Sequence, residues 1–186
     1  MDRAQAFDIM NKYIKAEHLV KHSVAVEICM RAYAEHFGQD IEYWGQVGLL
    51  HDIDFDLYPQ EHLQHTEEIL AKEGFDKEFI ENVLSHNRQW PNERTLIQKT
   101  LLAVDEMPGF VIACTLVRPD KDINNLEVKS VVKKFKDKAF ARAVNRDTMR
   151  ESAEALGVEL NEHIAFVINA LKQAKAHPVL GQVNLY

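Results

Sequence analysis

The chain has few cysteines, glycines and prolines, with two, seven and five of these residues among its 186. The scarcity of glycine and proline leaves little to interrupt regular structure and argues against a fold of many short strands and turns. Cys29 and Cys114 lie in apolar surroundings. We expect two buried free thiols rather than a disulfide, as in a reducing cytoplasm.

Long apolar runs are also missing. None approaches the ~20 residues of a membrane-spanning helix, and residues 1–5 lack the charged and then apolar order of a signal peptide. With 46% apolar and 27% charged residues, the composition is that of a globular chain. Its length suits a single hydrophobic core. We therefore expect one cytoplasmic domain over residues 1–186, without a membrane partner.

Positive charge is scarce except in one segment. The chain has 22 basic and 29 acidic residues, for a net charge of −7. An acidic body argues against non-specific binding of nucleic acid. Residues 129–150 are the exception, because eight of them are basic and two are acidic. This basic segment needs an explanation of its own.

Apolar residues recur with helical period along nearly the whole chain, which predicts an all-α fold. The run 109–117 is ambiguous between helix and strand, and its helical neighbours favour a helix. Glycine at positions 38, 74 and 157 separates expected helices. The other expected helices span about residues 4–14, 18–37, 40–51, 61–73, 76–86, 95–105, 128–136, 146–156 and 159–176.

Nine histidines are many for this length, and several stand beside carboxylates at the ends of expected helices. His51 and Asp52 directly follow the apolar run from Gly48 to Leu50, and an imidazole with a carboxylate makes a mixed pair of metal ligands. A single histidine near a helix end is more often a cap or a surface residue. An ordered set at helix edges is different, because converging helices can project their ligands onto one site. That set comprises His22, His51, Asp52, His65, His86 and Asp105.

These motifs, in this order, strongly resemble those of the HD superfamily of metal-dependent phosphohydrolases. The ending of the chain, from Glu106 through Arg118-Pro119 to Phe140-Ala141, resembles a group of small bacterial hydrolases of this superfamily. The resemblance implies a compact helical bundle with a metal-site core at about 18–110 and a C-terminal helical extension at about 111–186. The segments that carry the first resemblance are Leu19–Val26, Gly48–Asp54, His65–Leu70, Leu84–Asn87 and Ala103–Asp105.

The same resemblance implies two groups of metal ligands that share Asp52. His22, His51, Asp52 and Asp105 would form the first group, and His65 and His86 would add ligands for a second metal. His62 competes with His65 for its role, and we prefer His65 because the residues after it match the family better. Such a set of nitrogen and oxygen ligands suits one or two divalent ions of Mn, Fe, Co, Mg or Zn.

The acid/base chemistry departs from the family pattern. Many relatives have Gly-Lys after His-Asp-Ile, whereas this chain has Asp54 and Phe55. We expect Asp54 or Asp56 to position the water or to protonate the leaving group, with Asp52 as a catalytic metal ligand. For substrate phosphate we expect Arg88, Arg118 and Lys133, although each lysine by itself is more simply a solvated residue.

The expected function is hydrolysis of a phosphomonoester or phosphodiester bond by a metal-activated water. The partner would be a small phosphorylated molecule or a nucleotide. Two alternatives stay open. The first is a di-iron oxygenase, since a few proteins with this fold use the same six ligands for oxygen chemistry, and the second is a non-catalytic metal-binding regulatory module.

Overall fold

The computed structural model describes residues 1–142 and 144–186, and within them all regular structure is helical. The all-α prediction is confirmed, including the helix over the ambiguous run 109–117. The helices are α1 (Arg3–Tyr13), α2 (Glu17–His36), α3 (Ile41–Leu50), α4 (Thr66–Lys72), α5 (Lys77–Leu84), α6 (Leu96–Val104), α7 (Glu106–Leu116), α8 (Val128–Lys136), α9 (Arg146–Leu156) and α10 (Leu160–Lys175), with short 3₁₀ turns η1 (Ile123–Asn125) and η2 (Leu180–Gln182).

One helix differs from its prediction. The sequence predicts a helix over 61–73, but α4 begins at Thr66 and residues 51–65 form successive turns. Leu63 has a φ of +72°, which an α-helix cannot contain. The buried Asp54 carboxylate accepts the backbone N–H of His65 over 3.3 Å, just before the helix starts. These local contacts outweigh the helical period of the sequence.

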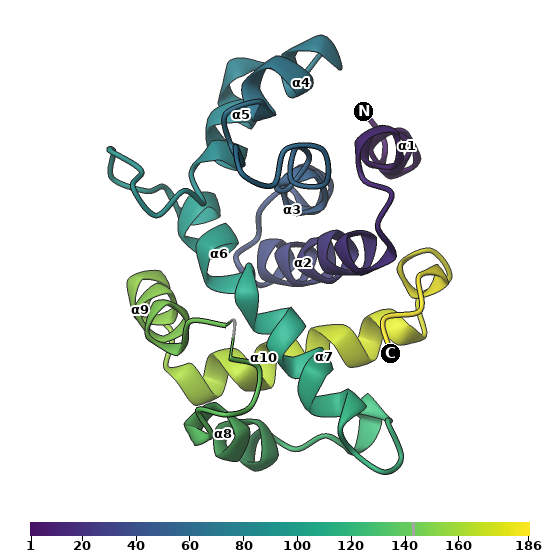
Figure 1. Ribbon diagram of the computed structural model, residues 1–186, viewed down its shortest axis with the longest axis vertical. Coiled ribbons are helices and arrows are strands. Elements are labelled where there is room, and N and C mark those ends of the chain that lie inside the picture. Colours follow the sequence, from purple (N-terminus) through teal and green to yellow (C-terminus); the bar gives the residue numbers. More distant parts are fainter. Residues whose placement is uncertain (143) are drawn as a thin grey trace.

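Helices α6 and α7 run through the middle of the molecule and connect its two ends (Figure 1). Helix α6 packs against α2, α3 and α5 on one side and against α9 on the other. Helices α4 and α5 lie at one end of the view, and α8, α9 and α10 occupy the other. Buried apolar side chains from Ala6 to Leu185 form one continuous core across both halves.

Helices α2 and α3 pack closely because two glycines of α3 face α2. A Cβ at Gly48 would lie 2.8 Å from Cγ of Met30 and 3.2 Å from Cα of Glu27, so only glycine fits without displacement. A Cβ at Gly45 would lie 2.5 Å from Nε of Arg31. This close packing sets the separation of the two helices that carry His22 and His51.

A buried ion network reinforces the same packing. The Glu27 carboxylate is fully buried and accepts hydrogen bonds from Arg3 of α1, over 2.7 and 2.9 Å, and from Arg31 over 2.8 Å. Arg31 in turn donates to both oxygens of Glu42 in α3, over 2.6 and 3.0 Å. Each buried charge is therefore paired, as burial requires, and α1, α2 and α3 are joined.

His163 forms a buried polar bridge on the other side of α2. Its Nδ1 accepts from the Tyr33 hydroxyl over 2.6 Å, and its Nε2 donates to the Ala103 carbonyl over 2.9 Å. Burial lowers the pKa of His163 to about 4, so the ring is neutral at pH 7. The bridge joins α10 and α2 to the end of α6 that leads to Asp105.

Cys29 and Cys114 are free and buried, as predicted. Among the described residues, no helix has both the length and the apolar character that crossing a lipid bilayer would require.

Candidate metal centre

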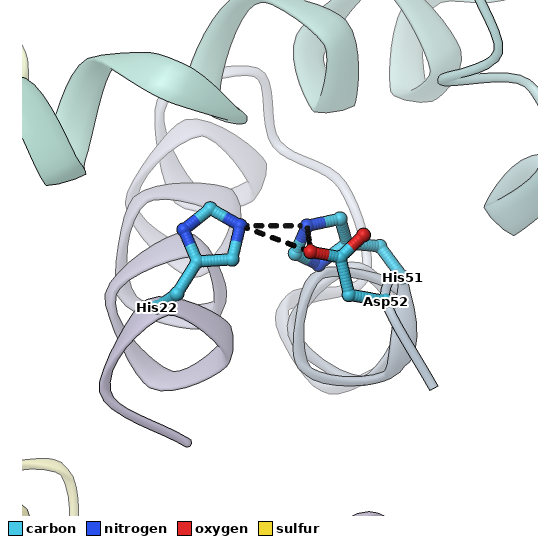
Figure 2. A group of neighbouring side chains, drawn as sticks. All are labelled: His22, His51 and Asp52. Atoms are coloured by element: carbon cyan, nitrogen blue, oxygen red, sulfur yellow. Dashed lines mark hydrogen bonds and ion pairs between the residues drawn. The ribbon is translucent and has the colours of Figure 1, made fainter. Parts of the chain in front are cut away.

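Four side chains from three parts of the chain meet at one point. Nε2 of His22 lies 3.0 Å from Nε2 of His51, and Figure 2 shows the two rings facing each other beside Asp52. Oδ2 of Asp52 lies 3.4 Å from both nitrogens. Oδ1 of Asp105 also lies 3.4 Å from both nitrogens. We call these four residues the first ligand group.

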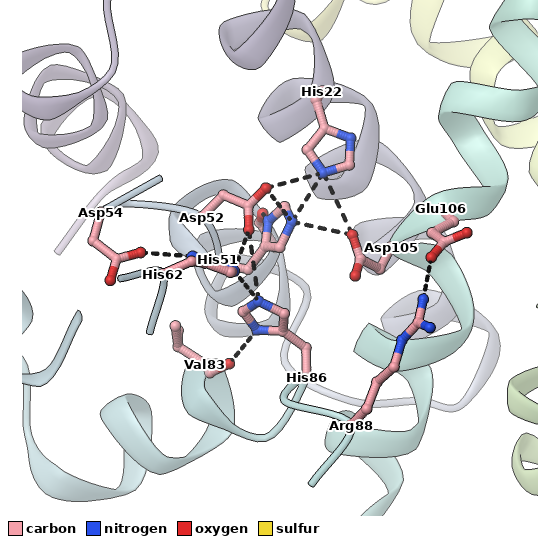
Figure 3. Close-up of polar contacts among 11 residues, drawn as sticks. His22, His51, Asp52, Asp54, His62, Val83, His86, Arg88, Asp105 and Glu106 are labelled. Atoms are coloured by element: carbon pink, nitrogen blue, oxygen red, sulfur yellow. Dashed lines mark hydrogen bonds and ion pairs between the residues drawn. The ribbon is translucent and has the colours of Figure 1, made fainter. Parts of the chain in front are cut away.

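A second group gathers around the other oxygen of Asp52 (Figure 3). Oδ1 of Asp52 lies 3.3 Å from Nε2 of His62 and 3.6 Å from Nε2 of His86. The two imidazole nitrogens lie 3.2 Å apart. The carboxylate of Asp52 thus faces one group with each oxygen, and His62, His86 and Asp52 form the second ligand group.

Helix ends supply most of these side chains. His22 lies in the second turn of α2, while His51 caps the C-terminus of α3 and Asp52 follows it. His86 follows the C-cap of α5, and Asp105 occupies the junction between α6 and α7. Several rigid helices therefore converge on the centre, which fixes ligand positions more precisely than loops would.

Backbone carbonyls at two helix ends orient two of the imidazoles. Nδ1 of His51 donates to the Gly48 carbonyl over 2.8 Å, and Nδ1 of His86 donates to the Val83 carbonyl over 2.6 Å. Both acceptors lie three residues before their histidine, among the last carbonyls of a helix, which lack partners within the helix. In the neutral ring these bonds place the lone pair on Nε2, which is the atom that faces each ligand group.

His62 is oriented by a side chain. Its Nδ1 donates to Oδ1 of Asp54 over 2.8 Å, and the Asp54 side chain is fully buried. Nε2 of His62 and Nε2 of His86 are then both acceptors, and they face each other and Oδ1 of Asp52. Three electron pairs directed at one point repel unless a cation lies among them.

The spacing of the donors also fits a metal ion. Ligand atoms bound about 2.0–2.2 Å from one ion lie about 2.8–3.1 Å from their neighbours in octahedral geometry and about 3.3–3.6 Å apart in tetrahedral geometry. The separations in the first group, 3.0–3.4 Å, fall in this range. Those in the second, 3.2–3.6 Å, also fall in it, at its tetrahedral end. The residues present therefore suit a divalent ion in each group.

The charges of the centre favour a cation as well. Burial alone would lower the pKa of His22, but hydrogen bonds with Asp105 and Asp52 outweigh burial and raise it to about 9. Burial of Asp105 would raise the pKa of its carboxyl, but hydrogen bonds from His22 and His51 hold it well below its usual range. Burial would likewise raise the pKa of the Asp52 carboxyl, but the charge of His51 holds it well below its usual range. Both carboxylates of the first group are therefore ionised at neutral pH, ready to bind positive charge.

A sequence model of the HD domain family matches residues 19–131, which is more than half of the chain and contains every residue of both ligand groups. The chain belongs to the HD domain family. Searches of curated proteins and of solved structures gave no match. As an HD domain, the chain carries its ligand groups on α2, directly after α3 and at the junction of α6 with α7, and His62 and His86 add two more ligands from the segments between α3 and α6.

The structure brings His62, and not His65, to the centre of this HD domain. Nε2 of His65 instead lies 2.6 Å from Oε2 of Glu61, and its ring stacks on Tyr58 with centroids 3.9 Å apart. The preference for His65 does not match this geometry. The reason is the absent helix: residues three apart share a face only in a helix, and residues 61–65 are turns.

Asp54 and Asp56 are both engaged in structural contacts. Asp54 holds His62 and the start of α4, so it acts on the centre through another residue. Oδ2 of Asp56 accepts the backbone N–H groups of Lys15 and Ala16 over 2.7 and 2.9 Å, which anchors the turns to the beginning of α2. This geometry gives the predicted acid/base role to neither carboxylate.

Of the three expected phosphate-binding residues, Arg88 alone is at the edge of the centre. Its Nη2 donates to Oε1 of Glu106, the residue after Asp105, over 2.5 Å (Figure 3). Arg118 pairs with Asp120 beyond the far end of α7, and a helix of 11 residues is about 16 Å long. Lys133 is exposed on α8, which packs on α7 and α10.

Three supporting residues are not evident from the sequence. Gly48 and Val83 act through backbone carbonyls, and Arg94 donates to the carbonyls of Ser85 and Asn87 over 3.0 and 2.7 Å, on either side of His86. For Gly48 and Val83, the sequence offers one signal, which is that each stands three residues before a histidine near the end of a helix. Arg94 leaves none.

Proposed function

We propose that the chain is a metal-dependent phosphohydrolase that cleaves a phosphate ester bond of a small phosphorylated molecule or nucleotide. The observation that supports this most directly is the shared carboxylate of Asp52, each oxygen of which faces a separate ligand group. Two metal ions held by one bridging carboxylate suit the hydrolysis of phosphate esters, because both the attacking and the leaving oxygen then face positive charge.

In this proposal the first ion would be held by His22, His51, Asp52 and Asp105, and the second by Asp52, His62 and His86. His62 takes the role that the sequence assigns to His65. Bound divalent ions would lower the pKa of water so that it attacks phosphorus near neutral pH, and they would offset the charge of the phosphate. Mn²⁺, Fe²⁺, Co²⁺, Mg²⁺ and Zn²⁺ all accept such ligands.

The protein's own residues hold this arrangement and admit the substrate. Gly48, Val83 and Asp54 fix the imidazole rings through Nδ1, so that Nε2 is presented as a ligand atom. The side chains of His22 and Asp105 are about one quarter exposed, at 24% and 25%, so solvent and substrate reach the first group. Arg88 is 53% exposed beside them and is a cation placed to contact a phosphate group of the substrate.

Metal analysis and a substrate panel test the proposal together. The purified protein would be assayed for bound metals, then loaded with Mn²⁺, Co²⁺ or Mg²⁺ and given phosphomonoesters, phosphodiesters and nucleotides. Hydrolysis by wild type, with loss of both metal and activity in Asp52→Ala, is the expected result. Metal binding without hydrolysis of any phosphate ester would overturn the enzymatic proposal and favour a regulatory metal-binding module.

The imidazole assignment has a matched pair of variants. His62→Ala is expected to lose the second metal, whereas His65→Ala is expected to keep the metal content of wild type. The opposite outcome would return His65 to the ligand set and remove His62 from it.

The shared carboxylate also suits a pair of iron ions, so a di-iron oxygenase is the competing function. It predicts iron as the bound metal, consumption of O₂ with a reduced organic substrate, and no hydrolysis with Mn²⁺, Co²⁺ or Mg²⁺. Oxygen uptake by the iron-loaded protein, measured beside the phosphatase panel, distinguishes the two enzymes.

A further inference from the structure

Glu106 connects the metal centre to a segment 39 residues further along the chain. Its Oε1 accepts from Nη2 of Arg88 over 2.5 Å, and its Oε2 accepts the backbone N–H of Asn145 over 2.9 Å. Asn145 is the N-cap of α9. One carboxylate next to the ligand Asp105 thus holds both Arg88 and the end of the segment that joins α8 to α9.

This segment has a defined conformation. We call its described residues, 137–142 with 144 and 145, the basic loop. The ring of Phe140 packs edge-on against Phe110 of α7, with centroids 5.5 Å apart. Ala141 has a φ of +43°, a conformation that alanine keeps only when its surroundings hold it. The guanidinium of Arg146 donates to four backbone carbonyls of the loop, those of Asp137, Phe140, Ala141 and Val144.

Two cations of the basic loop have no acidic partner. Lys138 and Arg142 are exposed, and among the described residues no carboxylate lies within ion-pair distance of either. Elsewhere in the basic segment Lys129 pairs with Glu127 over 2.6 Å and Arg150 pairs with Asp147 over 2.9 Å. Lys133, Lys134 and Lys136 of α8 likewise lack an ion pair among the described residues. Lys138 and Arg142 differ from them in lying on the loop that Glu106 tethers beside the metal centre, in a chain whose net charge is −7.

We propose that Arg88 and the basic loop, joined through Glu106, form an anion subsite that binds a second phosphate group of the substrate. The proposal rests on the proposed phosphohydrolase function, because it takes the reacting phosphate to lie at the ligand groups. The loop meets the centre through Glu106 rather than through a ligand, so its cations contact a group beside the reacting phosphate. The preferred substrate is then a phosphate ester that carries another phosphate, such as a nucleoside bisphosphate.

The test compares two substrates that differ by one phosphate. The Mn²⁺-loaded full chain would be assayed with adenosine 5′-monophosphate and with adenosine 3′,5′-bisphosphate, in wild type and in the double variant Lys138→Ala with Arg142→Ala. Lys129→Ala is the matched control, because it removes one positive charge from the same segment on the more distant first turn of α8. Metal content and thermal unfolding are measured for each variant.

Wild type is expected to have the higher kcat/KM with the bisphosphate. The double variant is expected to lower the ratio of the two kcat/KM values at least about tenfold, since charge-assisted hydrogen bonds are lost. The change is expected chiefly in KM, with wild-type metal content, and Lys129→Ala should retain the wild-type ratio. An unchanged ratio in the double variant, or an equal fall in Lys129→Ala, would overturn the subsite.

A binding measurement separates this proposal from the proposed function. If wild type hydrolyses neither nucleotide, calorimetric titration of the Mn²⁺-loaded protein with inorganic pyrophosphate still tests the subsite. Binding weakened at least about tenfold by the double variant, and not by Lys129→Ala, supports it. Equal affinity in wild type and double variant overturns it.

Discussion

Nδ1 of His62 donates to the fully buried carboxylate of Asp54 over 2.8 Å. This contact fixes both the ring orientation and the tautomer of His62, and it turns Nε2 toward Asp52 and His86. A carboxylate that orients a ligand imidazole in this way also makes the imidazole a better electron donor. Asp54 therefore influences metal binding through His62, without being a ligand itself.

Asp54→Asn is expected to weaken binding of the second metal about 10- to 100-fold, the usual cost of losing such a partner. The side-chain amide is nearly the same size as the carboxylate, but it lacks the negative charge that holds the Nδ1 proton. Calorimetric metal titration would resolve the loss. Asp56→Asn, which alters a carboxylate bound to the backbone of residues 15 and 16, is the control and should leave both metal affinities near wild type.

Metal binding should release protons at neutral pH. Hydrogen bonds with Asp105 and Asp52 raise the pKa of His22 to about 9 in the metal-free protein, so this ring is protonated at pH 7 and must lose its proton to bind a metal. Apparent affinity is therefore expected to increase as the pH rises toward 9. Calorimetry in two buffers of different ionisation enthalpy measures the protons released, and a value of zero at pH 7 would contradict the prediction.

The raised pKa of His22 should also make the folding stability of the metal-free protein depend on pH. The folded pKa of His22 exceeds the unfolded value of about 6.5, so the bound proton stabilises the fold fully below that pH. Its contribution is lost as the pH rises through about 9. Metal-free protein should thus lose stability over this interval, and protein loaded with metal should lose less.

Gly45→Ala is expected to destabilise the protein by about 1–3 kcal/mol, the usual cost of overpacking. The added Cβ would lie 2.5 Å from Nε of Arg31, whose guanidinium is held by Glu27 and Glu42 and has little freedom to move. Gly109→Ala is the control, because a Cβ there meets no atom within 4 Å and lies in α7. Urea unfolding should show that the control keeps or gains stability.

His163 should make folding stability depend on pH in the acidic range. Burial lowers its folded pKa to about 4, against about 6.5 unfolded, so the unfolded chain binds the extra proton between these values. Stability is therefore full above about pH 6.5 and falls as the pH drops toward 4. The loss between pH 7 and 4.5 is expected to be about 2–3 kcal/mol smaller in His163→Gln than in wild type, measured by urea unfolding.

The helical fold and most of the ligand residues could be predicted because they depend on patterns of residues that are close together in the sequence. Apolar periodicity marks the helices, and His51 with Asp52 marks a helix end. The choice between His62 and His65 could not be made in this way. It depends on the positive φ of Leu63 and on the contact of Asp54 with the His65 backbone, which stop α4 from starting earlier.

Contacts between residues far apart in the chain could not be predicted from the sequence either. Glu106 and Asn145 are 39 residues apart and meet through a backbone N–H, so neither residue type reveals the pair. Asp56 and Lys15 are 41 residues apart and meet in the same way. From the sequence, an acidic residue near a metal motif suggests a catalytic role. The structure shows that such a residue can instead bind the backbone of a distant segment and hold it in place.

His51 and His86 take their direction from main-chain carbonyls rather than from particular side chains. Substitution at position 83 should therefore be tolerated wherever the backbone path is kept and the new side chain can pack, whereas position 48 requires glycine because of its contact with α2. A change in chain length is different. Inserting one residue between Val83 and His86 would turn the imidazole about 100° around the axis of α5, so the orientation of His86 tolerates substitution of its acceptor residue but not a change in the length of the chain between them.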